Sequence, residues 1–444
     1  MAMDRDELNK RRQAREEQRK KRQKAQRSLY LRLAVAALVL ILCGVGIFQM
    51  TRGTGPASTA PELSATEAPA TEAPTEEATE EPTETRASWE QAPVTINVVA
   101  GGDLNITDKV VWSGQLSGEY DYTKTFMDVA PILSEADLAV LNFEGNVCGQ
   151  PYGTSTNSAP VELLHALKKA GVDLLQMANS YSIRNGLIGL TTTLSNIRST
   201  GIEPLGAFSS PEEFQRSKGY TIVTVSDIKI AFVAFTKGVG SLGMPAGSED
   251  CVNLLYTDYF TNYQKVDTDG IKAVLKAAAA EDPDITIALL HWGSEDNDTI
   301  YKTQTEIVSL MQKNGVDCII GSHPHRVQQV DYDESTGQMV AYSLGDFFGD
   351  ASRSGTQYSI LLDLQITKDY DTGITRITDW SFIPIYTLAE NECDGHRRVI
   401  RIENAMSAYE LNYVDKVTYS CYQNLEFALE RINERVYPKP ETKK

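Results

Sequence analysis

The sequence predicts a mixed α/β fold from residue 94 onward, with two sheets packed face to face and helices outside them. Two observations predict it. Between residues 95 and 199, apolar runs of β type alternate with stretches in which apolar residues recur at helical spacing, a pattern typical of a parallel, buried sheet. Beyond residue 206 the sequence is richer in β-type runs, which predicts a second set of strands.

The expected elements follow one another along the chain. The first half is predicted to contain strands at 95–100, 138–141 and 172–177 and helices at 122–135, 161–170 and 187–199. Ser226-Asp227 separates two β-type runs, 220–225 and 229–235, and indicates a hairpin. The second half is predicted to contain helices at 270–280 and 303–314 and strands at 285–290, 318–320, 327–330, 339–343 and 358–366. Apolar residues at helical spacing within 408–435 predict a helix that packs on the domain.

The N-terminal part has the pattern of a membrane anchor. Residues 1–32 contain twelve Lys and Arg against five Asp and Glu, a net charge of +7. Residues 33–50 are an apolar run without a charge, and about twenty such residues span the hydrocarbon core of a bilayer as a helix. A cleaved signal peptide has shorter basic and apolar regions, and a buried core helix would not precede low-complexity sequence. We expect one transmembrane helix at the cell membrane, with a cytoplasmic N-terminus and an extracellular C-terminal domain.

A low-complexity segment follows the expected anchor. Residues 51–93 consist mainly of Thr, Glu, Ala, Pro and Ser, as in Thr71-Glu72-Ala73-Pro74. Because the segment has few large apolar side chains to bury, it cannot offset the entropy lost on ordering. We expect a disordered linker that holds the domain away from the membrane.

The chain after the basic segment is strongly acidic. The whole sequence carries −18, and subtracting the +7 of residues 1–32 leaves −25 for the remainder. This charge argues against nucleic acid as a partner. It would also repel a polyanionic substrate unless a metal ion or a local basic patch offsets it.

Polar side chains occupy the ends of several predicted strands, where α/β proteins place their chemistry. Three of the five histidines lie in two such places, His291 and the pair His323 and His325. Asp103, Glu144 and Asn179 end three earlier strands. Singly, such a histidine is usually structural and a Gly-Asp is usually a turn. Together, carboxylate, carboxamide and imidazole groups favour a metal or phosphate site.

The ligand types restrict the metal. Carboxylates, a carboxamide and imidazoles suit one or two divalent cations, Mn, Fe or Zn, and the absence of clustered thiolates argues against a structural zinc. Two such ions would bind a phosphoryl group, activate water and neutralise developing charge.

A series of motifs gives a more specific indication. They are Gly102-Asp103, Asn142-Phe143-Glu144-Gly145, Ala178-Asn179, Gly206-Ala207, His291-Trp292-Gly293, Gly321-Ser322-His323-Pro324-His325 and Tyr342-Ser343-Leu344-Gly345. With them, residues 94–389 resemble the bacterial capsule-synthesis CapA family, the poly-γ-glutamate biosynthesis proteins, whose domain is related to calcineurin-like metallophosphoesterases. The resemblance implies a four-layer α/β/β/α metallophosphatase-like sandwich and a membrane-anchored ectodomain. It also implies a role in making or exporting an anionic polymer. The partners that it implies are the membrane proteins of polymer synthesis. Residues 390–444 would form a C-terminal helical extension.

The resemblance also implies a metal site, when the functional residues of the family are matched one by one to this sequence. The implied metal ligands are Asp103, Glu144, Asn179, His291, His323 and His325. The catalytic candidates are His323 and Tyr181. Where the family usually has Ala-Asn-Asn-His and then Asp, this chain has Ala178-Asn179-Ser180-Tyr181 and then Arg184, and Asp346 stands where asparagine is common. In the related phosphoesterases the histidine assists the leaving group, whereas a tyrosine, with an ordinary pKa of about 10, is a poorer proton donor.

Three functions remain open at this stage. The first is a CapA-like role in polymer biosynthesis or export at the cell surface, which both the motifs and the expected membrane topology favour. The second is a metal-dependent phosphoesterase that acts on an envelope phosphoester. The third is a polymer-binding scaffold with an impaired site, which the departures at Tyr181 and Arg184 favour.

Overall fold

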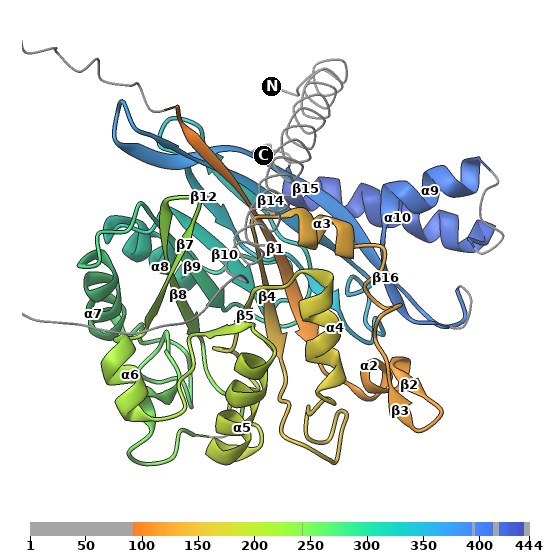
Figure 1. The fold of residues 1–444 in the computed structure, drawn as a ribbon, viewed down its shortest axis with the longest axis horizontal. Helices are drawn as coiled ribbons and strands as arrows, with labels where there is room; N and C mark the ends of the chain where they lie inside the picture. The colour runs from red at the N-terminus through yellow and green to blue at the C-terminus, as the bar shows by residue number, and fades with distance from the viewer. Residues whose placement is uncertain (1–91, 242, 393–395, 412–416, 439–444) are drawn as a thin grey trace, which may run out of the picture. The chain divides into compact units, whose positions relative to one another are not determined.

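The computed structural model describes residues 92–438 except 242, 393–395 and 412–416. Within these ranges, two large β-sheets form the centre of the fold (Figure 1). The larger sheet has the strand order β16 (Arg398–Arg401), β15 (Ile374–Leu388), β14 (Tyr358–Asp369), β1 (Val94–Asn105), β4 (Leu138–Glu144), β5 (Leu174–Gln176) and β6 (Glu203–Leu205). A short strand, β13 (Asp346–Phe348), also pairs with β1.

The smaller sheet has the strand order β11 (Val330–Asp333), β12 (Gln338–Ala341), β10 (Cys318–Ser322), β9 (Ile285–His291), β8 (Ile228–Thr236) and β7 (Tyr220–Val225). In this sheet β8, β9, β10 and β12 are parallel, and in the larger sheet β13, β1, β4, β5 and β6 are parallel. The remaining pairings are antiparallel. Because parallel strands end at the same edge, each sheet presents several carboxyl ends together.

The two sheets share one hydrophobic core. Along β8, Ile230 and Phe232 belong to the core shared with the larger sheet, whereas Ala231 and Val233 belong to a second core on the opposite face. This alternation follows from the period of two residues in a strand. The smaller sheet is therefore buried on both faces, which explains the continuous apolar sequence of its parallel strands.

Helices cover the sheets. Two of them, α7 (Thr268–Ala279) and α8 (Lys302–Lys313), supply apolar residues to the second core of the smaller sheet. The larger sheet is accompanied by α3 (Ala130–Glu135), α4 (Glu162–Ala170), α5 (Gly186–Ser199), α9 (Ile402–Glu410) and α10 (Tyr419–Val436). Figure 1 shows α9 and α10 beside β14, β15 and β16. The shorter elements are α2 (Asp108–Ser113), α6 (Pro211–Ser217), a 3-10 turn at Glu249–Cys251, and the hairpin of β2 (Gln115–Leu116) and β3 (Glu119–Tyr120).

The mixed α/β class is confirmed, and so is the hairpin, which β7 and β8 form around Ser226-Asp227. The helix expected over 122–135 is wrong in its first half, since α3 begins only at Ala130. Pro131 lies in the first turn of α3, and proline disfavours a helix that would continue through it from the N-terminal side. The preceding residues instead bury Tyr122 and Phe126 in the core.

Two other expected segments differ in extent. The strand expected at 327–330 begins at Val330, and the helix expected at 408–435 is represented by α9 and α10, with residues 412–416 undescribed between them. Residues 390–444, expected to be helical, also supply β16, which pairs with β15.

In the described part of the chain, no helix has the length and apolar character needed to cross a membrane. The expected transmembrane helix at 33–50 lies outside that part, as do the basic segment at 1–32 and the expected linker up to residue 91.

Candidate metal centre

The strand ends that the motifs mark converge on one buried cluster. Asp103 in β1 aligns with Asn142 in β4 and with Asp346 in β13, and His291 at the end of β9 aligns with Ser322 in β10. The backbone N–H of His323 donates a hydrogen bond to Oδ2 of Asp103 at 3.0 Å. This bond joins the carboxyl end of β10 in the smaller sheet to that of β1 in the larger sheet.

Asp103 is fully buried and is oriented from two sides. Its Oδ1 accepts a hydrogen bond from Nδ2 of Asn142 at 2.6 Å, and its Oδ2 accepts the one from His323. Burial raises the pKa of Asp103 to about 6, and the nearby Asp346 carboxylate adds to the rise.

Glu144, the last residue of β4, lies between the histidines. Its Oε1 is 3.1 Å from Nε2 of His291, and its Oε2 is 3.5 Å from Nε2 of His325. Burial, opposed by the positive charge of His325, raises the pKa of Glu144 well above its ordinary value. One carboxylate therefore contacts two different imidazole rings.

His291 is held by groups that determine where its proton resides. Its Nε2 accepts a hydrogen bond from the backbone N–H of Ser180 at 3.2 Å, which assigns the proton of the neutral ring to Nδ1. Burial lowers the pKa of His291 well below its ordinary value and so keeps the ring neutral. Two acceptor atoms, Nε2 of His291 and Oε1 of Glu144, then face each other at 3.1 Å.

The backbone after β10 has an uncommon conformation. His323 and His325 have φ of 92° and 58°, in the region that favours glycine, so the loop holds both rings at some conformational cost. Gly321 makes this path possible, since a Cβ there would lie 1.9 Å from the carbonyl oxygen of Tyr342. Nε1 of Trp292 donates to the same carbonyl at 2.9 Å. The tryptophan and glycine of the two motifs therefore fix how β9 and β10 end.

The side chains form three groups that could each hold a metal ion. They are Glu144, His291 and His323; Asp103, His325 and Asp346; and Glu295, His323 and His325. The first two groups are buried and share no residue, and Glu144 of the first group contacts His325 of the second. The cluster therefore has the donors for one ion or for two adjacent ions.

The buried donors fit a cation. In the described part of the chain, both carboxylate oxygens of Glu144 and Nδ1 of His323 are buried without a hydrogen-bond partner. Unsatisfied buried polar atoms cost free energy. A divalent cation would satisfy them and would separate the facing acceptors of Glu144 and His291, so the residues present suit the metal that the sequence predicts.

The implied ligands are brought together to different degrees. Asp103, Glu144, His291, His323 and His325 all belong to the groups above. Asn179, just after β5, is buried beside them, and its Nδ2 donates to the carbonyl oxygen of Phe143 at 2.7 Å. Its Oδ1 accepts from the backbone N–H of Tyr181 at 3.0 Å, which leaves one lone pair on that oxygen. A role for Asn179 as a ligand stays a prediction.

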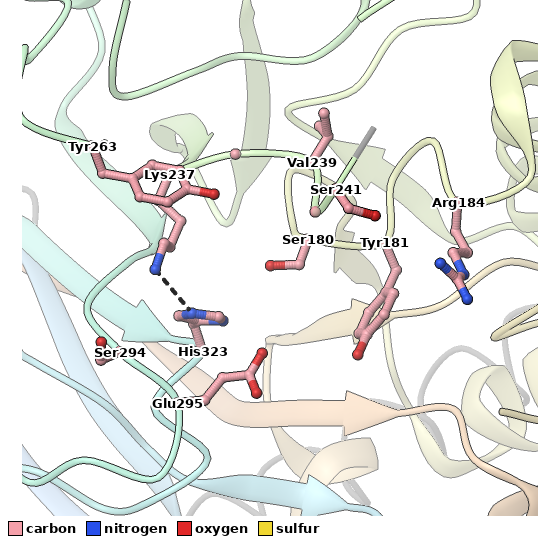
Figure 2. Close-up of a pocket in the computed structure, with 12 residues that line it drawn as sticks. Ser180, Tyr181, Arg184, Lys237, Val239, Ser241, Tyr263, Ser294, Glu295 and His323 are labelled. Carbon is pink, nitrogen blue, oxygen red and sulfur yellow. Dashed lines mark hydrogen bonds between the residues drawn. The ribbon is translucent and has the colours of Figure 1, made fainter. Parts of the chain in front are cut away.

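An open pocket of about 520 Å³ adjoins the cluster at His323 (Figure 2). Tyr181 lines it, and Figure 2 shows its ring directed toward Glu295. Burial and the Glu144 carboxylate raise the pKa of Tyr181 to about 12. The phenol is therefore protonated at neutral pH and can donate a hydrogen bond, while its ability to give up a proton is weaker than the sequence alone suggested.

The sequence analysis missed three charged residues near the cluster. Asp346 was treated only as a departure from a motif, yet its Oδ1 lies 2.7 Å from Nδ1 of His325. Lys237, with Nζ 3.4 Å from Nε2 of His323, directly follows β8. Glu295 lies in the loop after β9. Lys237 could have been found in the sequence, because it is a polar residue just after a predicted strand, as Asp103 and His291 are.

The chain is similar to known bacterial capsule proteins. Residues 97–351 match the family described as bacterial capsule synthesis protein PGA_cap. The chain is 24% identical over 268 residues to the PGA biosynthesis protein CapA of Bacillus subtilis (strain 168). This alignment covers 57% of this chain and 63% of that protein. The chain is 25% identical over 272 residues to the capsule biosynthesis protein CapA of Bacillus anthracis, covering 59% and 62%. The chain thus spans less than two thirds of either relative's length.

Solved structures are more distant. The calcineurin-like phosphoesterase YfkN from Bacillus subtilis aligns with 77% of this chain and 100% of its own, at 14% identity and a TM-score of 0.42. A likeness this low carries no argument about activity.

The fold and the cluster define a mixed α/β protein with a buried group of histidines and carboxylates that could hold a metal ion. Because the family match spans more than half of the 444 residues, the chain belongs to the bacterial capsule synthesis protein family PGA_cap. The predicted membership of the CapA family is confirmed.

Proposed function

We propose that the protein is a membrane-anchored, metal-binding member of a capsule or poly-γ-glutamate type biosynthesis or export system at the cell surface. The observation that carries the proposal is the buried cluster in which both carboxylate oxygens of Glu144 and Nδ1 of His323 have no hydrogen-bond partner, in a chain of the capsule synthesis family. The four-layer α/β/β/α sandwich would serve as a rigid support for that cluster.

The proposed centre holds one or two ions of Mn, Fe or Zn. Glu144, His291 and His323 would hold one ion, and Asp103, His325 and Asp346 the other. A metal bound there would polarise an oxygen of a phosphoryl or carboxyl group and offset its charge. The chain's own residues orient the centre, since Asn142 fixes Asp103 and the Ser180 N–H fixes His291.

The proposed location follows from the charge and hydropathy of residues 1–93. A basic cytoplasmic segment, a single anchor and an extended linker would place the domain outside the membrane, near a growing surface polymer. Protease added to intact cells should degrade the domain and spare residues 1–32. Protection of the domain until the cells are lysed would contradict the proposed topology.

A metal-dependent phosphoesterase is the second candidate. The open pocket beside His323 favours it, because a substrate can reach the cluster there. The third candidate is a polymer-binding scaffold with an impaired site, and Tyr181 and Arg184 favour it. Tyr181 stands where the family usually has a histidine, and among the described residues that line the pocket His323 is the one histidine. Turnover of a generic phosphodiester that requires Mn and is lost in His323→Ala would support the enzyme over the scaffold.

Elemental analysis of the full-length chain, purified in detergent, tests the metal centre. We expect near-stoichiometric Mn, Fe or Zn in the wild type and loss of the metal in the His323→Ala, His325→Ala double variant. His165→Ala is the matched control, because His165 lies on the exposed side of α4 and should leave the metal content unchanged. A wild type without metal after supplementation would contradict the proposed centre.

A genetic experiment tests the proposed pathway. Deletion of the gene should reduce the surface polymer, and the wild-type chain should restore it. Complementation by the double variant at the same protein level would show that the polymer function does not need the metal.

A further inference from the structure

The pocket beside the metal cluster carries positive charge on two sides. Lys237 and Arg184 both line it, and Figure 2 shows them on opposite sides, with His323 and Tyr181 between them. Lys237 follows β8 of the smaller sheet, and Arg184 follows β5 of the larger sheet. Each sheet therefore contributes one cation to the same space.

Lys237 is held in a defined position. Its Nζ donates a hydrogen bond to the carbonyl oxygen of Gly293 at 2.7 Å, and it lies 4.7 Å from the centre of the Tyr263 ring. The same Nζ is 3.4 Å from Nε2 of His323. An ammonium group has three N–H donors and no acceptor, so Lys237 can meet an anionic oxygen that enters the pocket.

Arg184 keeps most of its donors available. Its Nη2 donates to the carbonyl oxygen of Ser155 at 3.3 Å, and the side chain is exposed at the pocket. A guanidinium has five N–H donors in a planar fork that matches carboxylate and phosphate oxygens. This leaves a face of Arg184 for a ligand.

The described lining of the pocket contains one acid against two cations. Glu295 is the one acidic side chain among the described residues that line the pocket, and its Oε2 lies 3.7 Å from Nη1 of Arg353. Arg353 also pairs with Asp296 at 2.8 Å, so it is shared between two acids. The described charged residues that line the pocket, Lys237 and Arg184 against Glu295, still leave an excess of positive charge. In a chain with −25 outside its first thirty-two residues, such a local excess of positive charge favours an anionic ligand.

Lys237 also lies beside a cluster that is suited to cations. A metal ion bound in that cluster would repel the ammonium, and an anion placed between the two positive charges would lower the electrostatic energy of both. Hydroxyl groups of Ser180, Tyr181 and Ser241 also line the pocket and add neutral donors. The site thus combines charge, hydrogen-bond donors and enough space for a substituted oxyanion.

We propose that this pocket is an oxyanion-binding subsite, in which Lys237 and Arg184 hold an anionic oxygen group of the substrate beside His323. The inference rests on the proposed function, since it assigns a substrate class to the same centre. The oxyanion is either the phosphate of a phosphoester or a carboxylate of an acidic polymer, and both present the same anionic oxygens to the two cations.

Isothermal titration calorimetry on the full-length, Mn-loaded protein tests the subsite with two probes. The probes are inorganic phosphate and a γ-linked glutamate trimer. We expect the wild type to bind at least one probe. Lys237→Met, which keeps most of the unbranched side chain and removes its charge, should weaken that Kd by about tenfold or more, because a charge-assisted hydrogen bond is lost.

The remaining variants separate charge from general damage. Arg184→Met should weaken the same Kd about tenfold, whereas Arg184→Lys, which keeps the charge and loses the planar fork, should weaken it by less than Arg184→Met does. Lys302→Met is the matched control, because Lys302 is 89% exposed on α8 and contacts Glu306 of its own helix. It should bind as the wild type does.

The outcomes distinguish this inference from the proposed function. Binding of phosphate alone identifies a phosphoester source, and binding of the trimer alone identifies a polymer carboxylate. Binding of neither probe, or unchanged affinity in both Lys237→Met and Arg184→Met, overturns the subsite. Metal content, measured on the same samples, reports separately on the metal centre, so a normal metal content with unchanged affinities rejects the subsite alone.

Discussion

Nδ1 of His325 lies 2.7 Å from Oδ1 of Asp346, and both side chains are buried. Oδ2 of Asp103 is 3.5 Å from the same nitrogen, so one ring atom faces two carboxylates. Burial by itself lowers the pKa of His325, but Asp346, Glu144 and Asp103 outweigh it and raise the pKa well above its ordinary value. In the metal-free protein, a protonated His325 therefore supplies the positive charge that these acids require.

Asp346→Asn should weaken metal binding while the fold is kept. The substitution preserves the shape of the side chain and removes the carboxylate that contacts Nδ1 of His325. Groups that orient or complete a metal site typically contribute about 10–100-fold in affinity. We expect a loss of that size in a titration with Mn, with an unchanged circular dichroism spectrum.

Asp331→Asn serves as the control, because Asp331 is an exposed acid on β11. It should bind Mn as the wild type does. Equal affinities for Asp346→Asn and the wild type would mean that Asp346 takes no part in the centre.

Metal affinity should rise with pH. Burial raises the pKa of Asp103 to about 6 in the metal-free protein, and the carboxylates hold His325 protonated at neutral pH. A metal ion binds the deprotonated groups, so binding must release protons. We expect affinity to increase by up to about tenfold for each pH unit and each proton released, from pH 5 to 8.

The same shifts predict how stability changes without metal. A histidine whose folded pKa is raised contributes stability that is present below its unfolded pKa and is lost as the pH rises through the folded value. The melting temperature of metal-free protein should therefore fall as the pH rises above 7 toward the raised pKa of His325. Bound Mn should remove this fall, and identical slopes with and without metal would contradict the role given to His325.

Much of the centre could be predicted because its residues end strands. Asp103, Glu144 and His291 each close a run of apolar residues, and the carboxyl ends of parallel strands meet at one edge. The sequence showed which side chains end strands, and the geometry of parallel sheets then brought them together.

The contribution of Asp346 could not be predicted in this way. It opens β13, a strand of three residues that pairs with β1 at Asp103, and the two residues are more than two hundred positions apart. A strand of three residues is too short to show an alternation of apolar and polar residues in the sequence. Only the folded chain brings the two acids together. The helix expected at 122–135 failed for a related reason, since tertiary packing of Tyr122 and Phe126 in the core prevailed over helical spacing.

Gly321→Ala should destabilise the domain and disturb the centre together. The added Cβ would lie 1.9 Å from the carbonyl oxygen of Tyr342 and 2.5 Å from Nε1 of Trp292. Since backbone atoms cannot give way, β10 must move, and we expect the free energy of unfolding to fall by about 3 kcal/mol, at the upper end of overpacking effects. Urea denaturation measures the loss.

Gly243→Ala is the matched control, because its Cβ would meet its nearest neighbour, Phe260, at an ordinary 3.8 Å. It should leave the urea midpoint nearly unchanged. A Gly321→Ala protein with wild-type stability would show that β10 and β12 can separate at little cost.

Tyr181 gives the sharpest test of whether the centre performs chemistry. Its pKa, raised to about 12 by burial and by Glu144, makes the phenol a weak proton donor at neutral pH. An imidazole titrates near pH 6.5 and is better matched to that task, and a matched general acid contributes about 10²–10⁴-fold to a rate. If the Mn-loaded wild type hydrolyses a generic phosphodiester, Tyr181→His should raise kcat by about tenfold or more.

Tyr181→Phe separates the two roles of the phenol. If Tyr181 only donates a hydrogen bond, this variant should lower kcat by less than about tenfold, since a neutral hydrogen bond contributes about 0.5–1.5 kcal/mol. Loss of all turnover in Tyr181→Phe, with metal content unchanged, would instead identify Tyr181 as the proton donor. That result would mean that the bound substrate lowers the pKa of the phenol, because the residue is half-buried and faces acidic groups when the pocket holds no ligand.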